Sequence, residues 1–163
     1  MASPDDLSSL VVRLAEARIE FVLVGGLAAV AQGAPLTTHD VDIVHRREPE
    51  NVDRLLALLT SLNARYRGRP RGADLRPSST ILLGSGHSLL MTDLGPLDVL
   101  GAIEGGRAYE DLLDHAVELD VAGHPVRVLS LAAIADLKRG SNHPKDRYVL
   151  AILDETLRRT RQR

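Results

Sequence analysis

The chain contains no cysteine and no tryptophan, and it has only one phenylalanine and three tyrosines among its 163 residues. The lack of cysteine excludes disulfide bonds, thiolate metal sites and cysteine nucleophiles. A metal ion would therefore have to bind to carboxylate, imidazole or carbonyl groups, and carboxylates favour hard ions such as magnesium or manganese. The shortage of aromatic residues leaves leucine, valine, isoleucine and alanine to pack the core.

Long hydrophobic runs and a strong net charge are absent too. The longest uncharged apolar stretch, residues 21–31, is too short for a membrane span, which needs about 20 residues. The first six residues are polar and acidic, unlike a signal peptide. We therefore expect a cytoplasmic protein without a membrane segment. The formal net charge is −2, so binding of nucleic acid would require a local basic patch.

The pattern of apolar residues predicts a mixed fold of the α/β (α+β) class, with a mixed sheet flanked by helices and a helical C-terminal end. We expect one domain over residues 1–163, with a core at about 7–128 and C-terminal helices at about 130–159. The expected helices are 7–18, 27–32, 49–63, 109–114, 131–139 and 144–159. The expected strands are 21–24, 40–44, 79–83, 88–92, 97–100, 117–121 and 125–128, and residues 65–77 are expected to form a loop.

Three aspartates stand out because they interrupt strand-like apolar segments. Asp40 and Asp42 flank Val41, and side chains two residues apart on a strand point to the same face. Asp98 lies inside the apolar run 97–100, where a lone carboxylate costs several kcal/mol unless it is paired or bound to a metal. If the two strands are neighbours, the three carboxylates could hold two magnesium ions about 3.5–4 Å apart, the arrangement used in phosphoryl transfer.

A pair of glycines precedes these aspartates. Gly25 and Gly26 follow the apolar segment 21–24 and precede an expected helix. Glycines at such a place let the backbone approach a ligand and leave N–H groups for phosphate oxygens. Taken alone the pair would be read as an ordinary turn. Together with the aspartates it indicates a phosphate-binding role.

The order of these motifs resembles the nucleotidyltransferase superfamily, which has a DNA polymerase β-like fold. The matching segments are Gly25-Gly26, then Thr38-His39-Asp40-Val41-Asp42, then Gly95-Pro96-Leu97-Asp98, and the similarity extends over about residues 20–155. Within the superfamily the chain most resembles bacterial toxins of the AbiEii type and similar minimal nucleotidyltransferases.

The resemblance implies roles for individual residues. Asp40, Asp42 and Asp98 would be the catalytic carboxylates and would bind Mg²⁺ or Mn²⁺. A nucleoside triphosphate such as ATP would contact a second set of residues: Gly25, Gly26, Thr38, Lys138 and Lys145. His143 stands where many relatives have arginine. Since histidine is charged only when acidified, this change puts the nucleotide contact of that segment in question.

The implied reaction is the transfer of a nucleoside monophosphate from a triphosphate to an acceptor hydroxyl. Asp98 would also help to deprotonate that hydroxyl. The acceptor would be RNA, as in the toxin-like relatives, with a cognate antitoxin protein as partner; the alternatives are a protein or a small molecule such as an antibiotic. A further alternative is an inactive nucleotide-binding or partner module of the same fold.

Five arginines lie in or beside the expected loop 65–77. They are Arg65, Arg67, Arg69, Arg71 and Arg76. We expect a solvated, mobile loop here. The alternative is a contact with RNA or phosphate, with Tyr66 available for stacking on a base.

Overall fold

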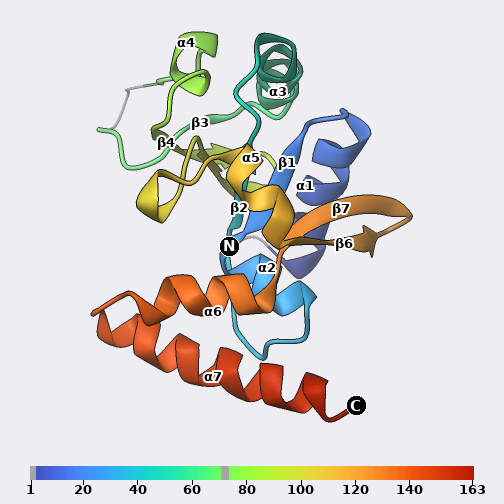
Figure 1. Ribbon diagram of the computed structural model, residues 1–163. Coiled ribbons are helices and arrows are strands. Elements are labelled where there is room, and N and C mark those ends of the chain that lie inside the picture. Colours follow the sequence, from blue (N-terminus) through green and yellow to red (C-terminus); the bar gives the residue numbers. More distant parts are fainter. Residues whose placement is uncertain (1–2, 71–73) are drawn as a thin grey trace.

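A seven-stranded mixed sheet runs through the part of the chain that the computed structural model describes, residues 3–70 and 74–163 (Figure 1). The strands are β1 (Phe21–Val24), β2 (Val41–His45), β3 (Arg65–Tyr66), β4 (His87–Thr92), β5 (Gly95–Leu100), β6 (Ala116–Val121) and β7 (His124–Leu129). Their order is β3-β4-β5-β2-β1-β7-β6. The pairs β2–β5 and β1–β7 are parallel, and the others are antiparallel.

Helices pack against this sheet, and two further helices follow its last strand at the C-terminal end. They are α1 (Pro4–Glu16), α2 (Gly25–Ala31), α3 (Pro49–Ser61), α4 (Ser79–Leu82), α5 (Tyr109–Leu112), α6 (Leu131–Arg139) and α7 (Pro144–Arg161), with short 3₁₀ turns at Glu104–Gly106 and Leu113–His115. In Figure 1, α6 and α7 lie side by side at one end of the molecule, opposite α3 and α4. The mixed fold class with a helical C-terminal end is therefore confirmed.

The first helix shows how local sequence sets an element. Ser3 caps α1: its side chain accepts a hydrogen bond from the backbone N–H of Asp6, while the Asp6 carboxylate accepts one from the Ser3 N–H. This reciprocal pair satisfies two backbone donors that the helix start leaves free. Leu7, Leu10 and Leu14 then turn one face of the helix into the core, where each is buried.

The fully apolar segment of β1 reflects its central place in the sheet. β1 pairs with β2 on one side and with β7 on the other, and all of its residues are buried. A strand covered on both faces has no need of alternating polar residues. β1 therefore fixes β2, which carries Asp42, in the middle of the sheet.

Two sequence expectations for the region before β4 are wrong. Residues 79–83 were expected as a strand, but α4 occupies Ser79–Leu82, because Ser78 accepts a hydrogen bond from the Ile81 N–H at 3.4 Å and caps a helical turn. A short apolar run cannot distinguish a strand from a buried helical turn. The expected loop 65–77 begins with β3, which pairs with β4 and extends the sheet.

None of the helices in the described residues is both long and apolar enough to cross a membrane. The longest of these helices, α7, has 18 residues and carries charged side chains along its length.

Candidate active site

The three aspartates predicted to lie together do so where β2 and β5 pair. Asp40 immediately precedes β2, and Asp42 lies within it. Asp98 on β5 is the direct neighbour of Asp42 in the parallel pairing of the two strands. One carboxylate oxygen from each aspartate lies within 4.8 Å of the others. We call these three residues the carboxylate cluster.

Asp42 has a carboxylate oxygen that is closed off from solvent. Its Oδ1 atom is buried and has no hydrogen-bond partner among the described residues. Burial, with smaller contributions from the nearby Asp40 and Asp98, raises the pKa of Asp42 from 3.8 to about 8, while the Arg67 guanidinium opposes this shift. An oxygen without a partner beside two further carboxylates fits a hard divalent cation.

Arg67 joins the cluster from the edge of the sheet. Its Nη2 atom donates to Oδ1 of Asp98 at 2.6 Å, and its Nη1 atom donates to the backbone oxygen of Leu90 at 3.0 Å. The expectation of a solvated loop is therefore wrong at this residue, whose side chain is only 26% exposed. The loop composition could not identify which arginine would turn inward, because that depends on the pairing of β3, a strand of two residues.

None of the other arginines that the structure describes in this segment forms an ion pair with the cluster. Arg69 lies over the ring of Tyr66, at 5.7 Å from its centroid. Arg76 binds the side chains of Asn63 and Asp74. Arg71 lies outside the described residues.

The two glycines begin α2 rather than preceding it, next to the cluster. Gly25 has φ +72°, and a Cβ atom there would overlap the carboxylate of Asp42. A Cβ atom on Gly26 would lie 3.1 Å from Oγ1 of Thr38. Thr38 in turn donates a hydrogen bond to the backbone oxygen of Asp40 at 3.3 Å. Glycine at position 25 is thus required by the close approach of Asp42 as well as by its positive φ.

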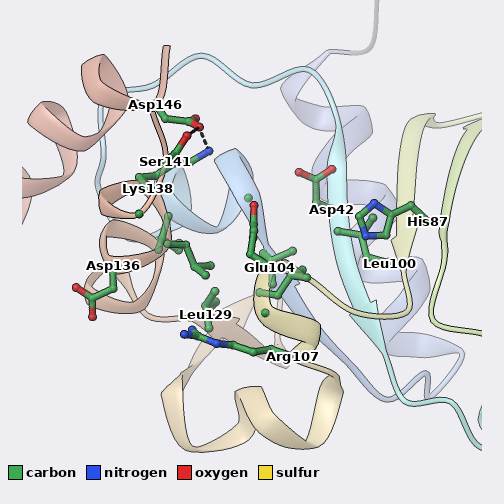
Figure 2. A pocket seen from close by; sticks show the side chains of 17 residues that line it. Asp42, His87, Leu100, Glu104, Arg107, Leu129, Asp136, Lys138, Ser141 and Asp146 are labelled. Carbon is green, nitrogen blue, oxygen red and sulfur yellow. Dashed lines mark hydrogen bonds and ion pairs between the residues drawn. The ribbon is translucent and has the colours of Figure 1, made fainter. Parts of the chain in front are cut away.

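A cavity of about 820 Å³ opens beside the cluster, a size typical of small-molecule sites. Gly25 and Asp42 line it together with Lys138 and Asp146, and Figure 2 shows Asp42 on the opposite side from Lys138 and Asp146. Figure 2 shows the Glu104 side chain between these two sides. Asp136 and Arg107 also line the cavity, so its walls carry acidic groups besides the cluster and two basic ones, Arg107 and Lys138.

The two lysines of the predicted nucleotide site have different positions. Lys138 lines the cavity, and its Nζ atom donates to Oδ1 of Asp146 at 2.9 Å. Ser141 donates to the other oxygen of Asp146 at 2.6 Å, as the dashed lines in Figure 2 mark. Lys145 is exposed and is not among the residues that line this cavity.

His143 has a local role that its sequence position did not reveal. Its Nδ1 atom accepts a hydrogen bond from the backbone N–H of Lys145 at 3.2 Å and caps α7. This acceptor role requires the neutral ring, with any proton on Nε2. The ring therefore stabilises the start of the helix that holds Asp146.

Comparison with known proteins decides the family. The sequence model of the aminoglycoside-2''-adenylyltransferase family matches residues 6–153. The chain belongs to this family. The expected membership of the nucleotidyltransferase superfamily is therefore confirmed, and the protein is a nucleotidyltransferase by family.

Solved structures of such enzymes share the fold of this aminoglycoside-2''-adenylyltransferase family member. The lincomycin-bound lincosamide antibiotic adenylyltransferase LnuA superimposes with a TM-score of 0.63 at 13% identity, covering 95% of this chain and 98% of that one. ANT(2'')-Ia in complex with adenylyl-2''-tobramycin gives 0.58 at 18% identity, covering 92% and 88%. A putative nucleotidyltransferase from Thermotoga maritima gives 0.54 at 21% identity, covering 100% and 97%. A comparison with curated protein sequences found no match to the chain.

These relatives bear on the choice of acceptor. The family model is named for aminoglycoside adenylyltransferases, and two of these structures are antibiotic adenylyltransferases. The comparisons supply no support for an RNA acceptor or for an antitoxin partner. At identities below 25% the structural likeness itself shows only the fold.

Proposed function

We propose that the protein transfers an adenylyl group from ATP to a hydroxyl of an amine-bearing antibiotic of the aminoglycoside type. The observation that carries the proposal is the carboxylate cluster at the side of a cavity of about 820 Å³, in a chain of the aminoglycoside-2''-adenylyltransferase family. The cavity has room for a small acceptor beside a nucleotide.

Asp40, Asp42 and Asp98 would hold Mg²⁺ or Mn²⁺. The fit rests on the partnerless buried Oδ1 of Asp42 and on the approach of all three carboxylates to within 4.8 Å. Ions held there would neutralise phosphate charge and polarise the phosphoryl group. The absence of cysteine agrees with a site for a hard ion.

Residues around the cluster would place the triphosphate. Gly25 and Gly26 offer backbone N–H groups at the start of α2, next to Asp42. Thr38 lies beside them, and Lys138 faces the cavity from the other side. We assign Lys138 the main cationic contact, and Lys145, which is exposed, an outer contact.

The chemistry is a displacement at the α-phosphorus. The acceptor hydroxyl oxygen forms a bond to that phosphorus, the bond from phosphorus to the bridging oxygen of the β-phosphate breaks, and pyrophosphate leaves with the electron pair. Asp98 would take the hydroxyl proton through Oδ2, because Oδ1 is already bound to Arg67.

The charge of the cavity supports an amine-bearing acceptor. Its lining holds four carboxylates, from Asp42, Glu104, Asp136 and Asp146, against two cations, Arg107 and Lys138. Carboxylates in a cleft attract ammonium groups and repel the phosphates of an RNA backbone. The cavity therefore favours a cationic small molecule over RNA.

The experiment is a transfer assay with ATP labelled at the α-phosphate and magnesium. The acceptors are tobramycin, lincomycin and total RNA, each in a separate reaction. We expect label on tobramycin, no label on RNA, and loss of transfer in Asp42→Asn. Label on RNA alone would instead support the toxin-like function, and nucleotide binding without any transfer would support the inactive binding module.

A further inference from the structure

Arg67 is fixed at both ends beside the carboxylate cluster. Its backbone N–H donates to the Leu89 oxygen at 2.9 Å, and its guanidinium donates to both Leu90 and Asp98. Arginine presents several donors in a planar fork and stays charged at any physiological pH. The guanidinium is therefore a permanent, preorganised positive charge at the cluster.

No other lysine or arginine among the described residues forms an ion pair with the cluster. Lys138, on the opposite wall of the cavity, is paired with Asp146 instead. The Arg67–Asp98 pair is partly shielded from solvent, with side chains 26% and 15% exposed. Shielding from water strengthens the interaction of such a charge with any ion that approaches the same carboxylates.

The guanidinium and a divalent ion would draw on the same negative charge. Arg67 occupies Oδ1 of Asp98 and leaves Oδ2, and its positive charge repels a second cation. A triphosphate brings several negative charges to the cavity and would reverse this balance. The cluster would then need both the guanidinium and the ion to compensate its own charge and that of the phosphates.

We propose that Arg67 is an internal cation of the carboxylate cluster that weakens binding of a free divalent ion, so that the ion enters together with the triphosphate. The inference rests on the proposed function, since it takes the cluster as the metal site. Arg67 is a positioning residue: it contacts Asp98 and acts on the metal through that carboxylate. If the metal ion binds only together with the triphosphate, the site holds no ion when the nucleotide is absent.

The test is titration with Mn²⁺ alone, followed by free-ion electron paramagnetic resonance, with and without a non-hydrolysable ATP analogue. The proteins are wild type, Arg67→Met, which removes the charge, and Arg67→Lys, which keeps the charge but not the fork. Arg67→Gln provides a second neutral variant that retains a donor for Asp98, in case the methionine variant does not fold. Circular dichroism confirms that each protein compared is folded.

We expect Arg67→Met and Arg67→Gln to bind free Mn²⁺ at least about 10-fold more tightly than wild type, because each change removes a positive charge that lies against a metal-binding carboxylate and repels the ion. Arg67→Lys should stay within about 3-fold of wild type, because the charge is retained. With the ATP analogue present, the difference between neutral variants and wild type should shrink. A gain in Mn²⁺ affinity that is smaller with the ATP analogue than without it would not result from a purely structural role of Arg67.

Two results would overturn the inference while leaving the proposed function intact. One is equal or weaker binding of free Mn²⁺ by both neutral variants, when wild type binds Mn²⁺ with the analogue. The other is binding by Arg67→Lys as tight as by Arg67→Met, which would exclude charge as the cause. If no protein binds Mn²⁺ with or without the analogue, the metal site of the proposed function fails, and this inference fails with it.

Discussion

Asp42 on β2 lies directly beside Asp98 on the parallel strand β5. Parallel pairing of these strands brings together carboxylates that are 56 positions apart in the sequence, from 42 to 98. Both residues are only partly exposed: Asp42 carries a buried oxygen without a partner among the described residues, and Asp98 is held by Arg67. The pairing of the two strands therefore sets two carboxylates side by side, and a bound cation would reduce the repulsion between them.

The pH dependence of stability should reveal Asp42. Its pKa is raised from 3.8 to about 8 in the folded, metal-free protein, so between these values the native state holds a proton that the unfolded state has lost. The contribution of Asp42 to stability is fully present below pH about 4 and is lost as the pH rises toward about 8. Thermal melts of metal-free wild type should therefore lose more Tm between pH 5 and 8 than those of Asp42→Asn. Parallel pH profiles would contradict the burial of this acid.

Gly25 should tolerate alanine poorly. A Cβ atom there overlaps the Asp42 carboxylate, and φ is +72°. Gly33 is the matched control, because its φ is +97° but nothing lies within 4 Å of a Cβ atom. Gly33→Ala should cost about 1–2 kcal/mol from backbone strain alone, and Gly25→Ala should cost more and weaken Mn²⁺ binding. Urea unfolding measures both; equal costs with unchanged Mn²⁺ binding would show that Gly25 does not meet Asp42.

Lys138 and Lys145 should differ in their effect on nucleotide binding. Lys138 lines the cavity and Lys145 does not. A charge-assisted contact to phosphate contributes roughly 1.5–3 kcal/mol, so Lys138→Met should weaken binding of the ATP analogue at least about 10-fold. Lys145→Met should weaken it by less than about 3-fold. Calorimetric titration of both variants measures the affinities. A larger loss in Lys145→Met than in Lys138→Met would contradict the proposed position of the triphosphate beside α6.

Glu104 should act on the acceptor and not on ATP. Its side chain lies in the cavity between Asp42 and Lys138 (Figure 2). Glu104→Gln should raise KM for tobramycin about 3- to 5-fold and leave KM for ATP within about 2-fold, since an exposed ammonium–carboxylate contact is worth at most about 1 kcal/mol. Glu118→Gln, on the exposed side of β6, is the control. An increase in KM for ATP instead would assign Glu104 to the nucleotide.

Much of the fold was predictable because its signals are local. The heptad-like leucines of α1, the apolar segment of β1 and the alternation in β2 follow from burial on one face or both. The motif order also predicted the meeting of Asp40, Asp42 and Asp98. These residues are carboxylates within or beside apolar strand segments, where burying a charge is costly. Such acids can be recognised in the sequence.

What could not be predicted depends on contacts between distant segments. Arg67 enters the site only because β3 pairs with β4, and a strand of two residues leaves no periodic pattern. Glu104 reaches the cavity from a 3₁₀ turn, a segment without a pattern of its own. The sequence put the nucleotide contact of the His143 segment in question but did not predict that the His143 ring caps α7, a role set by backbone geometry at the helix start.

Single-turnover transfer of label from α-labelled ATP to tobramycin tests the central claim most directly. Wild type with magnesium should label the antibiotic, and Asp98→Ala should reduce the rate at least about 10³-fold, the loss expected for a metal-binding catalytic carboxylate. The same variant should still bind the ATP analogue, because Gly25, Gly26 and Lys138 remain. Undiminished transfer by Asp98→Ala, or label that wild type places on RNA and never on an antibiotic, would contradict the account.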